Sequence, residues 1–406
     1  MNTAPISPQA RRSSFAARLL LLAVSVLFTL GALEGAARYW LLNLAGPREF
    51  LRYASLRQLD DQRLAASRKG VERRYTPHRY LGYIPTPNYR LGDNWHNSLG
   101  FRGDEIPRPK PAGEFRIVCI GGSTTYTGRV DPVELTFPVL LGKQLHERGY
   151  PQVRVVNGGA EGWGSWEALI NLETRVLDLE PDLIVDYDGI NDLHARLVWP
   201  PETYRGDNSG RRAANVSAVV MPGILEYSTL ARILLVRGGR LEPHADLSRT
   251  IDRPATTWYA PEFWRQWRRG DYPRELFTTV SVEQMLAANP PVYFRRNLES
   301  LVAVARAHGA DTMLATFADA RAFPKDATSS PEYTRGIEEM NEVVRQVAAA
   351  TGAHLFDFAA AMPRGKEYFA DGEHVNARGS AKKAELFAEA IVTRNLVPAP
   401  SPAAAP

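Results

Sequence analysis

The sequence has little cysteine and no blocks of like charge. Cys119 is the only cysteine in the 406 residues, so the chain can form neither an intrachain disulfide nor a thiolate metal site. Because Cys119 lies inside an apolar run, we predict a packed, inert thiol. Lysine and arginine are scattered, and a net charge of +4 with a pI of about 9.1 is mild for this length. The composition therefore gives no indication of a nucleic-acid-binding protein.

Nucleotide and metal motifs are missing as well. The Gly-Trp-Gly stretch at 162–164 lacks the third glycine of a dinucleotide fingerprint, and no Gly-Lys-Ser/Thr phosphate loop occurs. The eight histidines are dispersed, without a His-Glu-x-x-His pattern. We therefore expect no cofactor and no metal. A hydrophobic content of 44% is enough to bury a core, which excludes a disordered chain.

A long apolar segment lies near the N-terminus. Three arginines precede an uncharged run from Leu19 to Leu33, which Glu34 ends. This run is too apolar for a surface helix of a soluble domain, so we predict a signal anchor over residues 1–45. A cleaved signal peptide is the alternative, because Gly35–Ala37 is a passable small-residue site. Since long domains are often translocated whatever their flanking charge, we expect the remaining chain on the periplasmic or extracellular side.

Strand-length and helix-length segments alternate from Phe115 onward. This alternation predicts an α/β fold with three α/β/α layers, in which helices cover both faces of a parallel sheet of about five strands. We expect strands at 117–120, 153–156, 183–187, 312–317 and 354–358, and helices near 134–148, 165–177, 292–307, 331–350 and 376–394.

The alternation of strand-length and helix-length segments is interrupted between the third and fourth predicted strands. We therefore divide the chain into an anchor (1–45), a linker and preamble (46–113), a first domain part (114–194), an insertion (195–291), a second domain part (292–395) and a disordered tail (396–406). The insertion carries Trp258-Tyr259, Phe263-Trp264 and Trp267-Arg268-Arg269. These side chains could line a sugar site, lie at a membrane interface or simply pack against the domain.

Ser123 is the candidate nucleophile. The β-rich run from Ile117 to Ile120 breaks at two glycines, and Ser123 follows at once. This position is the carboxyl end of a predicted buried strand, where open α/β sheets build their sites. Gly-Gly-Ser is also ordinary turn chemistry, so the assignment depends on partners elsewhere in the chain.

Three later segments that follow strands carry suitable polar groups. They are Asn157–Gly162, Asp188–Asp192 and Asp371–His374. Because the carboxyl ends of parallel strands share one edge of a sheet, these loops and Ser123 should converge.

The residue types in these loops fit acyl transfer. A serine hydroxyl needs an adjacent base, and His374 could take its proton while Asp371 orients the imidazole. The backbone N–H groups of Ser123 and Gly162 and the side-chain amide of Asn191 could bind the oxyanion. A second Asp-x-x-His motif ends at His96, but it precedes the sheet and predicts only a loop histidine.

Taken together, these segments resemble the blocks of the SGNH (GDSL-type) hydrolase superfamily. The blocks are Gly121-Gly122-Ser123-Thr124-Thr125, the Asn157–Gly162 turn, Gly189-x-Asn191-Asp192 and Asp371-x-x-His374, in this order. The stretch from Asn97 to Gly103 also resembles the sequence that precedes the hydrolase domain in membrane-anchored bacterial members of this superfamily.

The resemblance implies a three-layer, flavodoxin-like fold and ester hydrolysis through an acyl-serine. It implies a catalytic triad of Ser123, His374 and Asp371, with oxyanion donors at Ser123, Gly162 and Asn191. Gly162 fits the family spacing from Asn157, although Gly158 and Gly159 lie close by. One departure is Gly122, which stands where the GDSL pattern has aspartate; that aspartate is not the triad carboxylate, so catalysis is compatible with the change.

Three functions are consistent with these residues. The first is a serine esterase acting on O-acyl esters of carbohydrates or lipids. The second is an O-acyltransferase that uses the same triad with an envelope or extracellular polysaccharide as acceptor. The third is a non-catalytic glycan-binding or assembly protein on the same fold.

Overall fold

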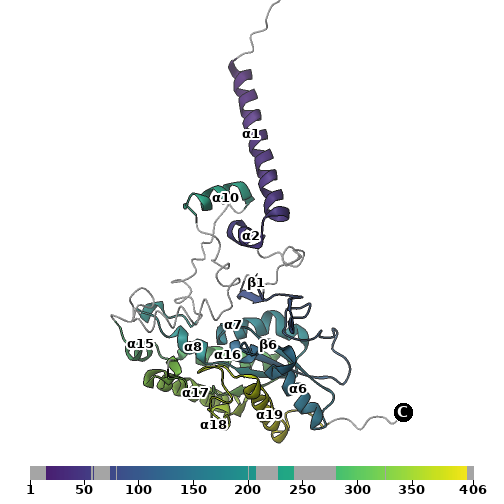
Figure 1. Cartoon of the computed structure of the whole chain (residues 1–406), viewed down its shortest axis with the longest axis vertical. Helices are drawn as coiled ribbons and strands as arrows, with labels where there is room; N and C mark the ends of the chain where they lie inside the picture. Colours follow the sequence, from purple (N-terminus) through teal and green to yellow (C-terminus); the bar gives the residue numbers. More distant parts are fainter. Residues whose placement is uncertain are drawn as a thin grey trace, which may run out of the picture. The chain divides into compact units, whose positions relative to one another are not determined.

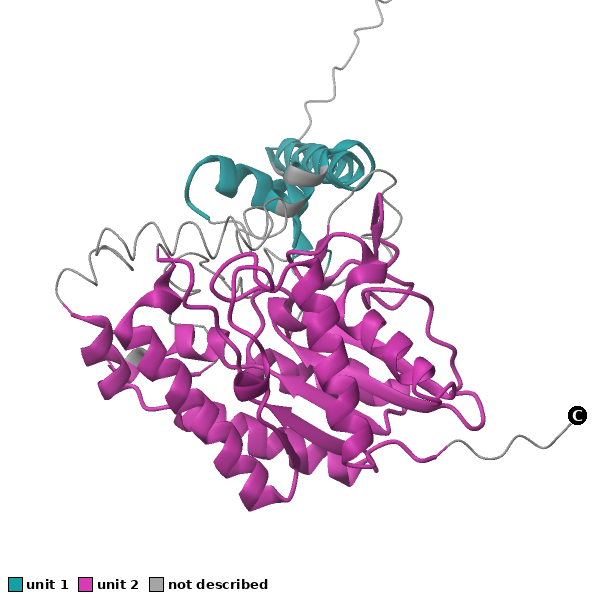
Figure 2. Cartoon of the chain, turned by 60° about the horizontal axis from the view of Figure 1, so that its bottom comes forward, with its two compact units in different colours: residues 1–59, 219–244 teal, residues 60–218, 245–406 magenta. Residues whose placement is uncertain are grey.

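A computed structural model of the chain describes residues 15–55, 58, 74–78, 80–199, 201–206, 227–241, 280–324 and 326–399. The chain divides into two compact units (Figure 2). Unit 1 comprises residues 1–59 and 219–244, and unit 2 comprises residues 60–218 and 245–406. The predicted aromatic cluster at 258–269 and the tail from 400 to 406 lie outside the described residues.

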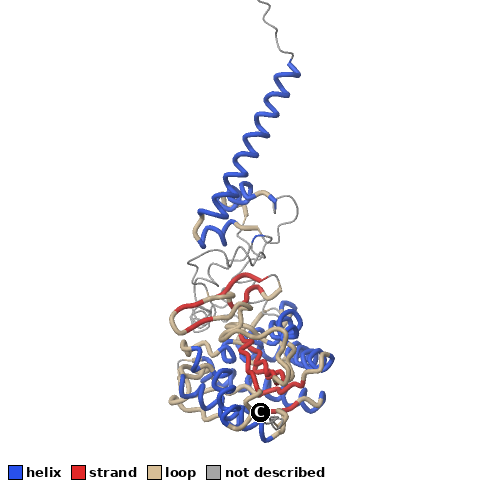
Figure 3. The backbone as a smooth tube through the Cα atoms, turned by 90° about the vertical axis from the view of Figure 1, so that its right-hand side faces the viewer, coloured by secondary structure: helices blue, strands red, loops and turns tan. Residues whose placement is uncertain are grey.

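Unit 2 is built on a parallel sheet of five strands in the order β6-β5-β7-β8-β9. The strands are β5 (Phe115–Gly121), β6 (Val153–Gly159), β7 (Leu183–Tyr187), β8 (Asp311–Ala315) and β9 (His354–Phe356). Helices lie on both sides of the strands (Figure 3), which confirms the predicted three-layer α/β fold.

The described helices of unit 2 are the five that the sequence predicts and four short ones, at 123–126, 190–195, 282–288 and 358–361, that it does not. They are α5 (Ser123–Tyr126), α6 (Phe137–Glu147), α7 (Ser165–Asn171), α8 (Ile190–Ala195), α15 (Val282–Ala288), α16 (Val292–Ala307), α17 (Pro331–Thr351), α18 (Phe358–Ala361) and α19 (Ala377–Thr393). Shorter turns are the 3-10 helices Val133–Leu135, Leu177–Leu179, Pro201–Thr203 and Ala327–Ser329 and the π-helix Leu172–Val176.

Alternate residues of β5 enter two different cores. Ile117 and Cys119 pack in the core that contains residues of α6 and α19, whereas Val118 and Ile120 pack in the core that contains residues of α7 and α16. This division follows from the two-residue period of a strand, which points successive side chains to opposite faces. Both faces are therefore covered, and burial raises the pKa of the Cys119 thiol to about 12, in agreement with an inert thiol.

The preamble forms two small antiparallel hairpins. One pairs β1 (Tyr75–His78) with β2 (Gly82–Pro85), and the other pairs β3 (Arg90–Leu91) with β4 (Asn94–Trp95). Arg102 then forms an antiparallel bridge with Asn157 at the end of the edge strand β6. Residues 74–106 therefore pack as part of unit 2.

Unit 1 is entirely helical where it is described. It contains α1 (Phe15–Tyr39), the π-helix η1 (Trp40–Leu44), α2 (Pro47–Tyr53) and α10 (Thr229–Arg237) (Figure 1). The segment Ala17–Leu44, with a mean hydropathy of 2.1 over its most apolar window, is long and apolar enough to cross a membrane. A signal sequence also has this length and composition.

Candidate active site

Three of the loops that carry predicted site residues begin at one edge of the sheet, whereas Asp371 and His374 lie in the loop between α18 and α19. Gly121 at the end of β5 pairs in register with Gly159 of β6 and with Tyr187 of β7. Ser123, Gly162 and Asn191 follow these strand ends directly. The parallel register therefore brings together three segments that are up to 70 residues apart in sequence, as the strand-end argument predicted.

Ser123, His374 and Asp371 form a continuous hydrogen-bonded chain. The Ser123 Oγ atom lies 2.7 Å from His374 Nε2, and His374 Nδ1 lies 2.9 and 3.0 Å from the two carboxylate oxygens of Asp371. The Asp371 carboxylate also accepts the backbone N–H groups of Glu373 and His374, which fix its orientation. Ser123 is only half-buried, so a substrate can reach its hydroxyl.

The charges around His374 favour its protonated form. Burial alone lowers the pKa of His374, but the charge and the hydrogen bond of Asp371 outweigh burial and raise the pKa above its ordinary value. Burial would raise the pKa of Asp371. The charges of His374 and Arg129 instead hold the pKa of Asp371 well below its usual range, and Arg129 Nε lies 3.0 Å from Asp371 Oδ2. Asp371 is therefore ionised and can stabilise an imidazolium.

The three predicted oxyanion donors differ in how the structure holds them. Ser123 is the first residue of α5, so its own N–H has no carbonyl partner within that helix. Gly162 has φ +81°, a backbone conformation that favours glycine, and a Cβ there would approach the Tyr83 hydroxyl to 2.7 Å. Asn191 is buried, and its Nδ2 donates one hydrogen to the Trp163 carbonyl at 2.7 Å, which leaves its second N–H for another acceptor.

Gly122 is required by close packing rather than by its backbone angle. A Cβ at this position would lie 2.6 Å from the Trp163 carbonyl oxygen and 2.7 Å from Asn191 Nδ2. With φ −83°, the backbone itself would accept any residue. The glycine that departs from the GDSL pattern therefore leaves room for the Asn191 amide and the Trp163 carbonyl.

We expect Gly122→Asp, which restores the residue type of the GDSL pattern, to impair the enzyme. The added side chain must displace the Trp163 carbonyl or Asn191, so the rate of ester cleavage should fall about 10- to 100-fold, with a stability loss of about 1–3 kcal/mol. Ester turnover and urea unfolding should be measured for Gly122→Asp, for the wild type and for Gly122→Ala, which adds only the Cβ. Unchanged turnover in both variants would contradict the packing argument.

The preamble hairpin supports the loop that carries Gly162. Glu161 is buried, and its carboxylate accepts the Tyr75 hydroxyl at 3.1 Å and Arg74 Nη1 at 3.2 Å. The Tyr83 hydroxyl donates to the backbone carbonyl of Glu161. The sequence analysis did not identify these residues. The only signal was that part of the preamble resembles the sequence that precedes the domain in membrane-anchored bacterial members.

A buried lysine links the helix after His374 to the turn that carries Ser123. Lys383 lies on α19, and its Nζ donates to the Thr124 carbonyl at 3.1 Å while facing the Tyr187 ring at 3.6 Å from the centroid. Burial lowers the pKa of Lys383 well below its ordinary value. The residue was not a sequence candidate, because nothing in its local pattern distinguishes it from a surface lysine of an amphipathic helix.

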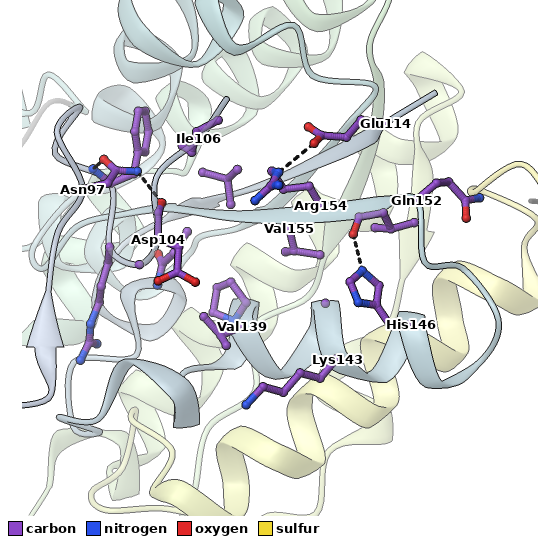
Figure 4. Close-up of a pocket in the computed structure, with 18 of the residues that line it drawn as sticks. Asn97, Asp104, Ile106, Glu114, Val139, Lys143, His146, Gln152, Arg154 and Val155 are labelled. Carbon is purple, nitrogen blue, oxygen red and sulfur yellow. Dashed lines mark hydrogen bonds and ion pairs between the residues drawn. The ribbon is translucent and has the colours of Figure 1, made fainter. Parts of the chain in front are cut away.

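Other candidate features lie away from this chain of hydrogen bonds. His96 is buried, with Nε2 2.8 Å from the Tyr126 hydroxyl, and burial lowers its pKa to about 3. A cavity of about 270 Å³ along β6 is lined by Asp104, Lys143 and His146 among others (Figure 4), and by none of the predicted triad residues and oxyanion donors. In the part of the chain that the structure describes, no cluster of His, Cys, Asp and Glu could hold a metal ion.

A comparison with known protein families identifies the family of this chain. The model of the "GDSL-like Lipase/Acylhydrolase family" matches residues 119–382, which include Ser123 and His374. No curated protein matches the sequence.

Solved structures that resemble the chain include three enzymes. An acetyl xylan esterase, AlAXEase, is 14% identical and matches over 68% of this chain and 100% of its own, with a TM-score of 0.40. The lipase/acylhydrolase from Enterococcus faecalis is 20% identical over 69% and 96% of the two chains, with a TM-score of 0.40. A GDSL-like lipase from Bacteroides thetaiotaomicron is 15% identical and matches over 72% of this chain and 91% of its own, with a TM-score of 0.37.

Proposed function

The chain belongs to the GDSL-like lipase/acylhydrolase family and is an ester-bond hydrolase, and from this premise we propose that it is a serine esterase with Ser123 as its nucleophile. The observation that carries the proposal is the uninterrupted chain from Ser123 Oγ through His374 to Asp371, with separations of 2.7 and 2.9 Å. A hydroxyl this close to an imidazole that is itself held by a carboxylate can be deprotonated as it attacks a carbonyl.

The reaction then proceeds in two halves. Ser123 Oγ bonds to the ester carbonyl carbon while His374 Nε2 takes the hydroxyl proton, and Asp371 stabilises the resulting imidazolium. His374 returns that proton to the departing alcohol as the carbon–oxygen bond of the ester breaks, which leaves an acyl-serine. A water molecule next attacks the acyl carbon, again giving its proton to His374, and the proton returns to Ser123 as the carboxylic acid leaves.

The negative oxygen of each tetrahedral intermediate requires donors. We assign this role to the N–H groups of Ser123 and Gly162 and to the free hydrogen of the Asn191 amide. Support comes from the Asn191–Trp163 hydrogen bond of 2.7 Å, which fixes the amide before the substrate arrives. Fixed donors of this kind are among the largest contributions to acyl-transfer catalysis.

A covalent probe tests the nucleophile directly. We expect a fluorophosphonate to add once to the wild-type protein and not to Ser123→Ala, with the mass increase mapped to the peptide that contains Ser123. Ser165, which is buried and hydrogen-bonded to Asp192, provides a matched control, and Ser165→Ala should still be labelled. Labelling of the folded Ser123→Ala protein at another residue, or no labelling of the folded wild type, would refute the assignment.

The Asn191→Ala variant tests the third oxyanion donor. Removal of one such donor costs on the order of 10²–10³ in kcat with little change in KM, because the interaction forms mainly in the transition state. Steady-state kinetics on a short-chain aryl ester would measure the change. Asn171→Ala, another buried asparagine, which hydrogen-bonds to the Gly158 carbonyl, is the control; an equal loss in both variants would indicate a structural rather than a catalytic effect.

We further propose that the natural substrate is an acylated envelope or extracellular polysaccharide. Support comes from the apolar N-terminal helix, which suits a membrane-attached enzyme, and from the Trp- and Arg-rich sequence at 258–269, which suits carbohydrate binding. Acetate release from acetylated polysaccharide, compared with release of fatty acid from lipid esters, distinguishes the substrate classes. Transfer of the acyl group to an added sugar, in place of its release into water, would favour the O-acyltransferase alternative. That reaction uses the same residues.

For localisation, we propose that the N-terminal segment stays attached as an anchor, with unit 2 on the periplasmic or extracellular side. Support comes from the hydrogen bonds that Glu34 of α1 makes inside unit 1, since cleavage at Gly35–Ala37 would remove them. Retention predicts an intact N-terminus in the membrane fraction after carbonate washing, and protease added outside the inner membrane should digest unit 2.

A further inference from the structure

Glu34 is the only acidic residue in the apolar segment Ala17–Leu44. Its carboxylate accepts the Ser228 hydroxyl and the backbone N–H groups of Thr229 and Leu230, each at 2.9 Å. Arg38 Nε, one turn along α1, donates to the same carboxylate at 2.6 Å. A carboxylate in such a segment is costly unless its charge is satisfied, and here it satisfies the open N–H groups at the start of α10.

The start of α10 is thus held by α1, and one of its faces is held by α2. Arg232 is buried and donates from Nε to the Tyr53 carbonyl at 3.0 Å, and Arg237 Nε donates to the Tyr53 hydroxyl at 3.3 Å. Ile233 and Val236 are buried as well. This helix, from the middle of the predicted insertion, is therefore joined to the N-terminal segment by specific contacts within unit 1.

The remaining face of α10 has one exposed apolar side chain, Leu234, with partly exposed Leu230 and Leu235 beside it, in the described part of unit 1. Leu234 is 61% exposed, and Leu44 at the end of the apolar segment is 66% exposed. Of the three arginines between Ser228 and Leu241, Arg237 and Arg240 are exposed, whereas Arg232 is buried. The nearest acidic residues in sequence are Glu226 and Glu242, which lie outside this stretch. An exposed leucine beside exposed arginines on a short helix is a combination found in helices that lie at the surface of an anionic bilayer.

The dimensions of α1 place Glu34 near a membrane boundary. The uncharged run from Leu19 to Leu33 spans about 22 Å at about 1.5 Å per residue, less than the roughly 30 Å thickness of a hydrocarbon core. Glu34 and the residues up to Trp40 therefore cover the transition into the headgroup region. There, α10 crosses the end of α1 instead of running along it (Figure 1).

We propose that α10 is an interfacial membrane helix, with the exposed face around Leu234 in contact with lipid and Glu34 as the residue that holds it to the anchor. The occupant of the exposed side of α10 is the bilayer itself, because the start of α10 is hydrogen-bonded to Glu34 of a segment that is long and apolar enough to cross a membrane. This inference rests on the proposed retention of the N-terminal segment. It gives the insertion a second attachment to the membrane and explains the acidic residue that interrupts the apolar sequence.

The test uses the full-length protein in phosphatidylcholine–phosphatidylglycerol vesicles. Cys119 is fully buried, so a thiol-reactive NBD fluorophore can be directed to one introduced cysteine. Leu234→Cys is the reporter, Leu27→Cys within the apolar segment is the lipid-exposed reference, and Ala381→Cys, exposed on α19 of unit 2, is the water-exposed reference. Quenching by nitroxide-bearing lipids and by aqueous iodide is measured for each.

We expect the Leu234 label to be quenched by lipid nitroxides to at least half the extent of the Leu27 label, and the Ala381 label to respond mainly to iodide. When Glu34→Ala is combined with the Leu234→Cys reporter, lipid quenching of the Leu234 label should fall at least twofold. Glu49→Ala, which removes an acidic side chain from α2, should not lower it. Fluorophosphonate labelling in the same samples reports on Ser123 separately, so failure of the catalytic proposal would be visible on its own.

Two results would overturn the inference. One is a Leu234 label that responds to iodide and not to lipid nitroxides while the Leu27 label is lipid-quenched, which would mean that the face is in water or covered by protein. The other is loss of the Leu27 label from the mature protein, which would mean that the N-terminal segment is cleaved and Glu34 is absent.

Discussion

The Ser123→Ala and His374→Gln variants are each expected to lower kcat/KM by a factor on the order of 10⁶, and the double variant should lose no more than either single variant. The reason is that the hydroxyl and the imidazole, 2.7 Å apart, act as one unit. Without the base, the hydroxyl is a poor nucleophile, and without the hydroxyl, the base has no proton to take. The residual activity should come from the oxyanion donors and substrate binding alone.

Kinetics on an aryl ester with all three proteins, each checked for folding by circular dichroism, would measure this coupling. His96→Gln serves as the control for loss of a buried histidine, because His96 hydrogen-bonds to Tyr126 and Thr86 and does not contact Ser123. Losses that multiply in the double variant would show that Ser123 and His374 act independently, which would contradict the proposed mechanism.

The Asp371→Asn variant is expected to lower kcat at neutral pH by a factor on the order of 10⁴. An amide at this position can hold the imidazole through its hydrogen bonds but cannot stabilise the imidazolium, and it can select the wrong tautomer. Arg129→Gln, which removes the other cation hydrogen-bonded to Asp371, should have a much smaller effect, because the charge of the carboxylate remains. Equal losses in the two variants would argue against a special role for the carboxylate.

The pH dependence of Asp371→Asn follows from the direction of the His374 pKa shift. In the wild type, Asp371 raises the pKa of His374 above its ordinary value, so the neutral base forms, and activity rises, at a pH above about 6.5. Without the charge of Asp371, burial lowers this pKa, and the acidic limb of the profile should move to lower pH. Burial raises the pKa of Glu373 to about 7, so Glu373→Gln is needed to separate its titration from that of His374.

The same pKa shift predicts how stability depends on pH. A histidine whose pKa is raised in the folded state contributes stability below its unfolded-state pKa, and this contribution is lost as the pH rises through the folded-state pKa. The wild type should therefore exceed Asp371→Asn in unfolding free energy most clearly at about pH 5, where both groups are charged. Urea titrations at several pH values would detect a difference that shrinks toward alkaline pH; a constant difference would contradict the ion-pair explanation.

Much of unit 2 could be predicted because its signals are local. The apolar runs that became β7 and α16 have the lengths and flanking turns of a strand and a helix, and both were predicted with the bounds that the structure has. Errors occurred at element ends, as at β6, where the strand continues to Gly159 because pairing with β5 extends through two glycines of low strand propensity.

The support of the site could not be predicted, because it depends on contacts between residues far apart in sequence. Tyr75 and Tyr83 contact Glu161 about 80 positions later, and Lys383 contacts Thr124 across 259 positions. No periodicity or motif records such pairs. Their sequence neighbourhoods look like those of ordinary surface or turn residues.

The sequence by itself determined the order of strands and helices, the apolar N-terminal segment and the identity of the polar residues at strand ends, because each is a short-range property of side-chain type and spacing. Only the tertiary structure decided which of these residues meet. The parallel register aligns the strand ends that precede Ser123, Gly162 and Asn191, and the fold places His374 2.7 Å from Ser123. Close packing makes Gly122 necessary, and Glu34 hydrogen-bonds to a helix almost 200 residues away. These relations are set by the three-dimensional path of the chain, which the local sequence does not encode.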